Sequence, residues 1–217
     1  ELEGLTDAGD ELGLHPHNWR WHDPAGRWVS DYGDERWVVH CARMALESYH
    51  AALGRPCAAY RHGDHAMTTA LACYLDDAGV TVDLTVEPGT PGLFGLVPEE
   101  LSIGWIPSTL AAPAHPYRPS RFDFRVEDPS RTDGLLEVPL TRGLDIEIVV
   151  DGGVCRPRGR WETLTLFDRP DRFRRRLLHR LDDPSLTHVA FAIRTDLPLR
   201  SELWSSFEAN LAELCRH

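Results

Sequence analysis

Two kinds of hydrophobic pattern alternate along the chain. Some segments repeat apolar residues every three or four positions, as amphipathic helices do, and short apolar runs typical of strands lie between them. The predicted helices cover residues 35–53, 66–78, 170–181 and 201–215. The predicted strands cover residues 11–17, 57–60, 80–86, 135–140 and 187–193. This alternation predicts an α/β fold.

The clearest helix signal lies between Asp34 and Gly54. Aspartate is a favoured N-cap residue, and glycine commonly ends a helix in the left-handed conformation. Between them, Trp37, Cys41 and Met44 recur at helical spacing. We therefore predict a helix that buries this stripe.

Length, charge and composition limit the classes of protein to which the chain can belong. The 217 residues suit one domain with its own core, and we predict a single domain over residues 1–217. A net charge of −11 excludes a nucleic acid as the expected partner, because phosphate binding needs a clustered basic surface. No apolar run reaches the length of a membrane span.

Cysteine usage bears on the cellular compartment. The five cysteines have no close spacing, which favours a reducing environment, and we expect a cytoplasmic protein. The first residue is Glu1 rather than Met, so the chain is expected to have lost a segment before it. An export signal in that segment stays open.

Two histidines stand two residues apart near the end of the first predicted strand. Because side chains alternate along a strand, His15 and His17 should point to the same face. Two neutral imidazoles on one face can bind a divalent metal such as zinc. The alternative is a pair of polar residues in a loop that follows the strand.

Other polar residues follow the ends of later strands. Arg61 and Asp64 follow one strand, Asp83 lies within the next, and Arg194 follows the last. Sites in alternating α/β folds lie at these carboxyl ends. Asp64 either pairs with Arg61 or caps the next helix, and Asp83 should need a partner such as Arg61 because a buried carboxylate is costly.

Further candidates lie around these positions. His62 and His65 could belong to the site, although a surface loop is the commoner place for such histidines. A polar loop after His17 is rich in aromatic residues. They could form a platform on which sugar rings stack, or pack down onto the domain, and they are Trp19, Trp21, Trp28 and Tyr32.

In their order and spacing, several segments resemble the polysaccharide deacetylase family with the NodB-type fold. These segments are Glu11–His17, Tyr60–Met67, Val82–Gly89, Ala114–Ser120 with Leu135–Pro139, and His188–Asp196. The fourth is similar to a stretch common in bacterial members. The resemblance covers nearly the whole chain and implies a distorted (β/α)7 barrel, incomplete if its first strand is missing.

The resemblance also implies a function. Members of the family hydrolyse N-acetyl groups on amino sugars with a divalent metal, an acidic base and a histidine acid. The implied substrate is an acetylated amino sugar or polysaccharide. The implied cofactor is a divalent metal, with zinc as the first candidate, bound by His15 and His17. The implied catalytic residues are Arg61, which orients the base in the family, with Asp64, Asp83 and Arg194.

Three departures from the family pattern bear on activity. The opening Asp-rich strand has no counterpart, so we expect this N-terminal strand to be missing. An upstream segment or a second copy should then cover the edges that the barrel exposes where the strand is missing. Many members place the second metal histidine where this chain has Trp19, so His17 must replace it. Arg194 stands where the family has its histidine acid, and arginine cannot release a proton near neutral pH.

Two classes of function therefore remain. One is a metal-dependent hydrolase that removes N-acetyl groups from an amino sugar or polysaccharide. The other is a catalytically impaired domain that keeps the fold and binds carbohydrate, or assists assembly in a polysaccharide pathway. The retained His15, His17, Arg61 and Asp83 favour the enzyme, whereas Arg194 and the absent acidic motif favour the binding domain.

Overall fold

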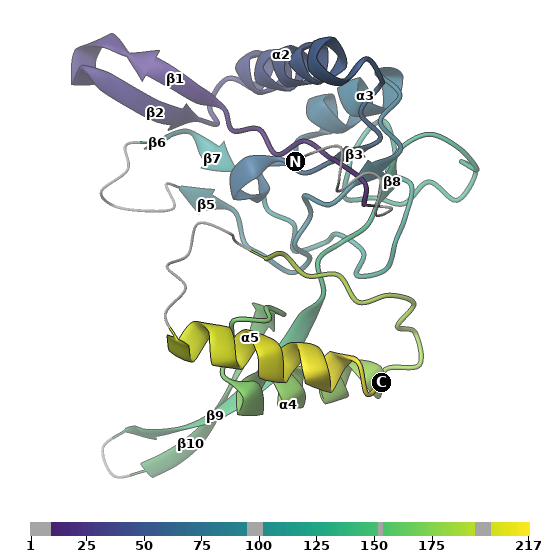
Figure 1. Cartoon of the computed structure of the whole chain (residues 1–217). Helices are drawn as coiled ribbons and strands as arrows, with labels where there is room; N and C mark the ends of the chain where they lie inside the picture. The colour runs from purple at the N-terminus through teal and green to yellow at the C-terminus, as the bar shows by residue number, and fades with distance from the viewer. Residues whose placement is uncertain (1–9, 95–101, 152–153, 194–200) are drawn as a thin grey trace. The chain divides into compact units, whose positions relative to one another are not determined.

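The chain divides into two compact units, Glu1–Pro139 and Leu140–His217. The structure, a computed structural model, describes residues 10–94, 102–151, 154–193 and 201–217 (Figure 1). Each unit contains its own cluster of buried apolar side chains. That residues 1–217 form a single domain stays a prediction.

In its described residues, the first unit has two α-helices among short strands. The helices are α2 (Glu35–Leu53) and α3 (Thr69–Asp77). The strands are β1 (Trp19–His22), β2 (Arg27–Asp31), β3 (Ala59–Tyr60), β4 (Val82–Asp83), β5 (Leu93–Phe94), β6 (Ser102–Ile103), β7 (Trp105–Ile106) and β8 (Leu136–Glu137). The predicted mixture of helices and strands is confirmed.

Helix α2 begins and ends where the sequence predicts. The Asp34 side chain accepts hydrogen bonds from the backbone N–H groups of Arg36 and Trp37, at 3.1 and 3.3 Å. Gly54 adopts the left-handed conformation, with φ of 66°, and its N–H donates to the carbonyl of His50. These two caps satisfy backbone groups that the helix itself leaves unpaired.

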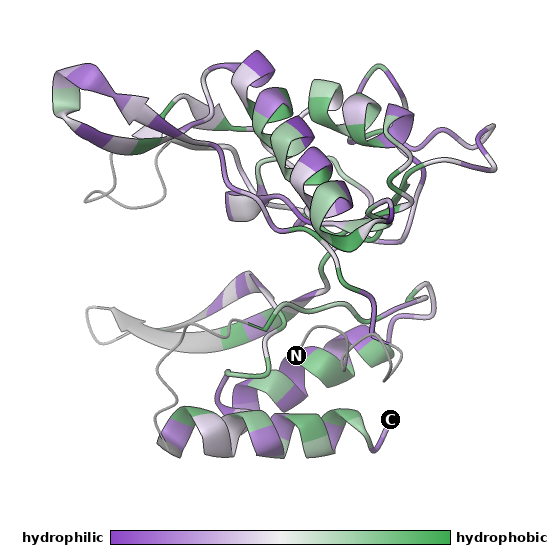
Figure 2. Cartoon of the chain, turned by 45° about the horizontal axis from the view of Figure 1, so that its top comes forward, coloured by the Kyte–Doolittle hydropathy of each residue, from purple (hydrophilic) through white to green (hydrophobic). Residues whose placement is uncertain are grey.

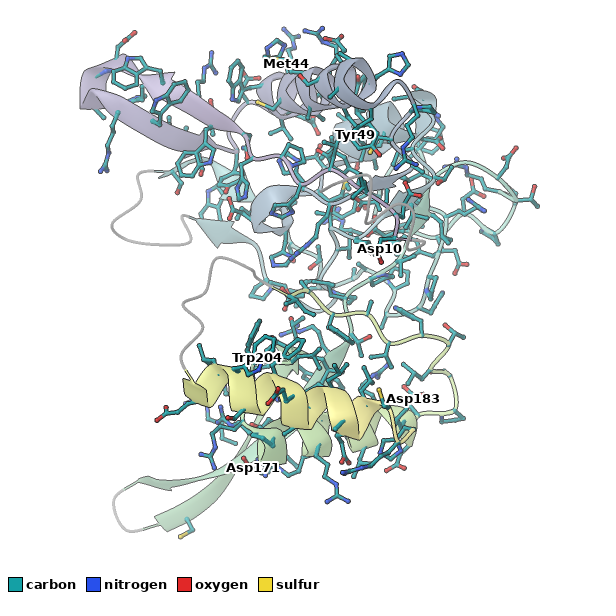
Figure 3. The ribbon with its side chains drawn as sticks, viewed as in Figure 1. Asp10, Met44, Tyr49, Asp171, Asp183 and Trp204 are labelled. Atoms are coloured by element: carbon teal, nitrogen blue, oxygen red, sulfur yellow. The ribbon has the colours of Figure 1, made fainter. Side chains whose placement is uncertain are left out.

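The buried face of α2 differs from the predicted stripe. Val38, Ala42 and Tyr49 are the buried residues, whereas the Met44 side chain is 51% exposed. Figure 3 shows Met44 and Tyr49 on opposite sides of the helix. The Tyr49 hydroxyl donates to the carbonyl of Leu12 at 2.7 Å, which ties the helix to the segment before the histidine pair.

A small parallel sheet positions the predicted site residues. Strand β4 lies between β3 and β8 and is parallel to both, with Tyr60 opposite Asp83 and Asp83 opposite Glu137. The segment around Leu14 extends this sheet next to β3, because Leu14 exchanges backbone hydrogen bonds with Ala59 and Arg61 at 3.0 and 2.9 Å. The predicted strand 11–17 is therefore reduced to one bridge.

The described residues form small sheets and no closed barrel. The other sheets have the strand orders β1-β2-β6, β5-β7 and β10-β9. A barrel needs a continuous hydrogen-bonded ladder around its whole circumference. Several of the strands here are two residues long, and the predicted (β/α)7 barrel is not confirmed.

The core of the first unit lies between the two helices and the parallel sheet. Helix α3 is capped by Thr68, whose hydroxyl accepts a hydrogen bond from the N–H of Leu71 at 3.1 Å. Figure 2 shows apolar and polar residues alternating along the helices. The fully buried members of the core include Val38, Tyr60, Met67, Leu71, Leu75, Val86 and Leu135.

The second unit combines a long hairpin with two helices. The elements among its described residues are β9 (Arg142–Asp151), β10 (Val154–Thr163), α4 (Pro170–Leu181) and α5 (Ser201–Leu214). Leu164, Leu166, Phe173 and Leu177 form its core. Residues 187–193 are not a strand, contrary to prediction, although Ala190 exchanges two hydrogen bonds with Thr141. No helix in the described part of the chain is long and apolar enough to cross a membrane.

Candidate active site

The two predicted metal histidines lie side by side. The centroids of the His15 and His17 rings are 5.1 Å apart, and the ring planes are nearly perpendicular at 80°. The backbone between them is extended, and the carbonyl of Pro16 accepts a hydrogen bond from the N–H of Gly63 at 2.8 Å. The alternation of side chains thus brings both imidazoles to one place, even though the segment forms only one bridge.

Asp64 joins the histidine pair to the hairpin formed by β1 and β2. Its Oδ2 atom lies 3.2 Å from His17 Nδ1 and accepts the hydroxyl hydrogen of Tyr32, just beyond β2. Burial alone would raise the pKa of Asp64, but the two hydrogen bonds outweigh it and lower the pKa. Asp64 is therefore a carboxylate at neutral pH. It does not cap α3, because Thr68 does.

The backbone at Asp64 is strained. Asp64 and His65 lie in the 3-10 turn η2 (Gly63–His65) and have φ values of 55° and 56°. Residues other than glycine rarely adopt positive φ, and such conformations persist only where the surroundings enforce them. Here the turn aims the Asp64 carboxylate at His17.

Gly63 is required by the close approach of the His17 ring. A Cβ atom at this position would lie only 2.4 to 2.6 Å from three atoms of the imidazole. Any larger residue would displace His17 or the turn. The sequence Gly63-Asp64 therefore supplies both the space for the ring and the carboxylate that orients it.

Arg61 acts on the site through its charge. Burial lowers the pKa of Arg61, while the nearby carboxylates of Asp83 and Glu87 oppose that shift. Burial also lowers the pKa of His15, and the charge of Arg61 lowers it further. His15 is consequently a neutral imidazole at neutral pH, which is the form that can accept a proton or bind a metal.

Asp83 has a different partner from the one expected. Instead of pairing with Arg61, it shares a hydrogen bond with Glu137 on the adjacent strand. It also accepts from the backbone N–H and the hydroxyl of Thr85, at 3.0 and 2.7 Å. Sequence reasoning missed Glu137, although this acidic residue interrupts an apolar strand in the same way that Asp83 does.

The Asp83–Glu137 pair holds a proton. Burial raises the pKa of both carboxyl groups, and the Asp83 charge raises that of Glu137 further. Two carboxylates on facing strands would repel each other unless one is protonated. The pKa of Glu137 is raised well above its ordinary value, and its Oε1 accepts a hydrogen bond from the N–H of Val86 at 3.1 Å.

His62 is a buried residue rather than the surface histidine that the sequence favoured. Its side chain is fully buried, with Nδ1 2.7 Å from the Tyr60 hydroxyl and Nε2 3.4 Å from Asn18 Oδ1. Burial lowers its pKa to about 4. His65, in contrast, is half-buried, and its Nε2 lies 3.5 Å from a carboxylate oxygen of Glu87.

The residues do not by themselves fit the expected metal. Among the side chains that the structure describes, no group of three or more His, Cys, Asp or Glu residues is arranged to hold a metal ion. His15 and His17 supply two imidazoles, whereas a zinc site in a protein normally has at least three protein ligands. Arg194, the remaining predicted catalytic residue, lies outside the described residues.

The arrangement does suit proton transfer. A carboxylate next to Nδ1 holds a histidine in the tautomer that carries its proton on Nδ1, which makes Nε2 the basic atom. Asp64 stands in this position toward His17, whose side chain is 32% exposed. His17 can therefore exchange protons with a bound molecule while Asp64 stabilises the charged ring.

Comparison with known proteins gives a distant similarity. The chain is similar to a crystal structure described as a "putative polysaccharide deacetylase" from Mycobacterium smegmatis, with 16% identity and a TM-score of 0.37. The match covers 64% of this chain and 35% of that one, so the chain spans about a third of that protein's length. No family model and no curated protein matches. A similarity at this level does not place the chain in that family.

Proposed function

We propose that the chain is a polysaccharide deacetylase-like hydrolase that removes N-acetyl groups from an amino sugar or polysaccharide. One observation carries this proposal: the Asp64 carboxylate holds His17 next to His15, at the end of a parallel sheet. Hydrolysis adds water across the amide C–N bond and releases acetate and a free amine. Such a reaction needs a group that takes a proton from water and returns one to the amine.

In this proposal His17 transfers the protons. Its Nε2 accepts the proton of the attacking water, Asp64 stabilises the imidazolium, and the same proton then passes to the leaving nitrogen. Burial and the charge of Arg61 keep His15 neutral, and Arg61 contributes positive charge near the developing oxyanion. Asp83 acts by positioning, through its contact with Glu137. Arg194 would bind an anionic group of the substrate.

A divalent ion, zinc first, remains part of the proposal. His15 and His17 would be two of its ligands, and His17 would then bind the ion through Nε2 instead of accepting a proton there, because Asp64 occupies its Nδ1 side. When bound, such an ion would polarise the acetyl carbonyl. The distorted barrel and a homo-oligomer follow from the same family resemblance and are proposed with it.

Acetate release from an N-acetylated oligosaccharide tests the proposed function. His17→Gln and Asp64→Asn should each lower kcat/KM at least about 100-fold, because each removes part of the proton-transfer pair. His115→Gln is the matched control, since the exposed His115 also pairs with a carboxylate, Glu127, at 3.1 Å. It should retain full activity.

Metal analysis of the same preparations belongs to this test. About one divalent ion per chain is expected, and His15→Ala should lose it. If the wild type releases no acetate, or if the His17 and Asp64 variants match the control, the hydrolase is ruled out. An ion that persists in His15→Ala would show that the proposed ligands are wrong.

A second candidate is a carbohydrate-binding domain without turnover. Two observations favour it: the described residues offer no three-ligand metal site, and the Asp83 and Glu137 carboxyl groups are buried in contact with each other. Neither carboxyl group could then serve as a base for substrate. Saturable binding of the oligosaccharide without acetate release would identify this function.

A further inference from the structure

The hairpin of β1 and β2 carries three tryptophans on one face. Trp19 and Trp21 are two residues apart on β1, so their side chains point the same way. Trp28 lies directly opposite Trp21 on β2, and directly paired residues share a face. The three side chains are 40%, 48% and 60% exposed in chain order. We call Trp19, Trp21 and Trp28 the tryptophan strip.

The outer part of the strip is held in a defined orientation. The indole N–H of Trp21 donates a hydrogen bond to Asp23 at 2.8 Å. The rings of Trp21 and Trp28 meet edge to face, with centroids 5.9 Å apart and planes at 76°. Exposed rings that are already ordered lose little conformational freedom when a ligand binds.

The strip is continuous with the candidate active site. The rings of Trp19 and His17 are 6.4 Å apart and nearly parallel, at 27°, and His17 in turn contacts His15. A line of rings thus runs from the histidine pair onto the hairpin. Figure 1 shows this hairpin projecting from the helices and the other strands of its unit.

The other face of the hairpin has a structural role. Val29 on that face is fully buried. Arg20, on the same face, pairs with Asp31 at 3.0 Å and lies over the ring of Trp37 at 4.9 Å. The hairpin is therefore anchored through one face, while the tryptophan strip stays exposed on the other. A cluster of large exposed apolar side chains commonly marks a binding surface.

We infer that the tryptophan strip binds successive sugar rings of an extended glycan and leads that glycan to His17. This inference rests on the proposed function and specifies its substrate as an oligomer or polymer. The C–H face of a pyranose ring carries partial positive charge and packs against the negative face of an indole. The net charge of −11 disfavours an anionic membrane as the occupant.

Planarity of the side chains provides the test. The double variant Trp21→Leu/Trp28→Leu keeps the strip apolar but removes two of its three flat faces, whereas Trp21→Phe/Trp28→Phe keeps them. Phe122→Leu is the control, because Phe122 is 96% exposed and lies outside the hairpin. Calorimetry would measure binding of a disaccharide and a hexasaccharide of N-acetylglucosamine to the whole chain, after thermal unfolding has shown that each variant is folded.

The wild type should bind the hexasaccharide more tightly than the disaccharide. The Leu double variant should lose roughly tenfold in affinity for the hexasaccharide and little for the disaccharide, while the Phe double variant and the control retain the preference. Equal affinity for the two sugars, or a Leu double variant that binds like the wild type, would overturn the inference. Self-association through the hairpin, seen by sedimentation and lost in the Leu variant, would also overturn it.

The same measurements separate this inference from the proposed function. If the hexasaccharide preference depends on the strip but no acetate is released, the glycan surface is correct and the hydrolase is wrong. If acetate is released with no preference for length, the hydrolase stands and the strip does not bind the substrate. Each proposal can therefore fail alone.

Discussion

Individual residues of the site differ in charge because their surroundings differ. His15 is exposed and feels the charge of Arg61, His17 is paired with Asp64, and His62 is enclosed by Tyr60 and Asn18. These histidines have one intrinsic pKa, and burial and neighbouring charges move it. Of these three histidines, only His17 combines solvent exposure with a carboxylate partner, which is why we assign proton transfer to it.

His62 should make the protein sensitive to acid. Its folded-state pKa of about 4 lies below the ordinary value of 6.5, so the unfolded chain binds more protons between these two pH values. Above pH 6.5, His62 is neutral in both the folded and the unfolded chain and costs no stability. As the pH falls from 6.5 toward 4, the folded state loses stability. The full effect is on the order of 3 kcal/mol, from about 1.4 kcal/mol per pKa unit.

Urea unfolding at pH 7 and pH 5 tests this prediction. His62→Gln keeps an acceptor for Tyr60 and a donor for Asn18 but does not titrate, so it should lose less stability on acidification than the wild type. His115→Gln should behave like the wild type. Equal acid sensitivity in His62→Gln and the wild type would contradict a buried neutral imidazole at this position.

At the scale of elements, register places the acidic residues of the site. Strands β4 and β8 pair over two residues, yet that pairing sets Asp83 directly opposite Glu137. Like charges in facing positions destabilise a sheet. The shared proton removes the repulsion and turns the pair into a link between the two strands.

The carboxyl pair should weaken the fold at high pH. The folded-state pKa of Glu137 lies above its ordinary value of 4.5. At a pH between these two values, the folded chain therefore binds more protons than the unfolded chain. This contribution to stability is complete below about pH 4.5 and falls as the pH rises, by up to about 1.4 kcal/mol per pH unit.

Glu137→Gln should remove this dependence, because the amide still donates to Asp83 and accepts from Val86 but has no proton to lose. The stability of this variant relative to the wild type should therefore increase between pH 5 and pH 8 in urea unfolding. Glu47→Gln, at an exposed glutamate that pairs with Arg43, should show a constant difference. A constant difference for Glu137→Gln would mean that the pair holds no proton.

At the scale of the whole molecule, the two units have separate interiors. The first unit buries the carboxyl groups of Asp83 and Glu137 beside its apolar cluster, whereas the second buries the side chain of Arg176 beside its own. Arg176 pairs with carboxylates from three segments of that unit, namely Asp145, Glu162 and Asp168. Loss of one partner from a buried ionic group is costly, because the others remain without compensation.

Arg176→Met should destabilise the second unit by about 3 to 5 kcal/mol. Hydrogen exchange followed by mass spectrometry should show faster exchange in α4 and β9, with protection retained in α2 and α3. Arg43→Met, at an exposed arginine on α2 that pairs with Glu47, should change neither unit. Equal loss of protection in both units would indicate one cooperative domain over 1–217, as the sequence analysis predicts.

The sequence by itself determined the features that depend on neighbouring residues. Asp34 and Gly54 cap α2, and α4 spans the predicted residues 170–181. The adjacency of His15 and His17 was predicted as well. Caps, helical periodicity and alternation all act within a few residues, so they can be recognised along the chain.

Only the tertiary structure decided which distant groups meet. Asp64 binds His17, which is 47 positions away, instead of capping a helix, and Asp83 meets Glu137 instead of Arg61. The tertiary packing also decided that Val38, rather than Met44, lies on the buried face of α2. Contacts of this kind depend on strand register and on competition among several polar partners. Both are settled only when the whole chain packs, because the free energy of each contact includes the desolvation of its surroundings.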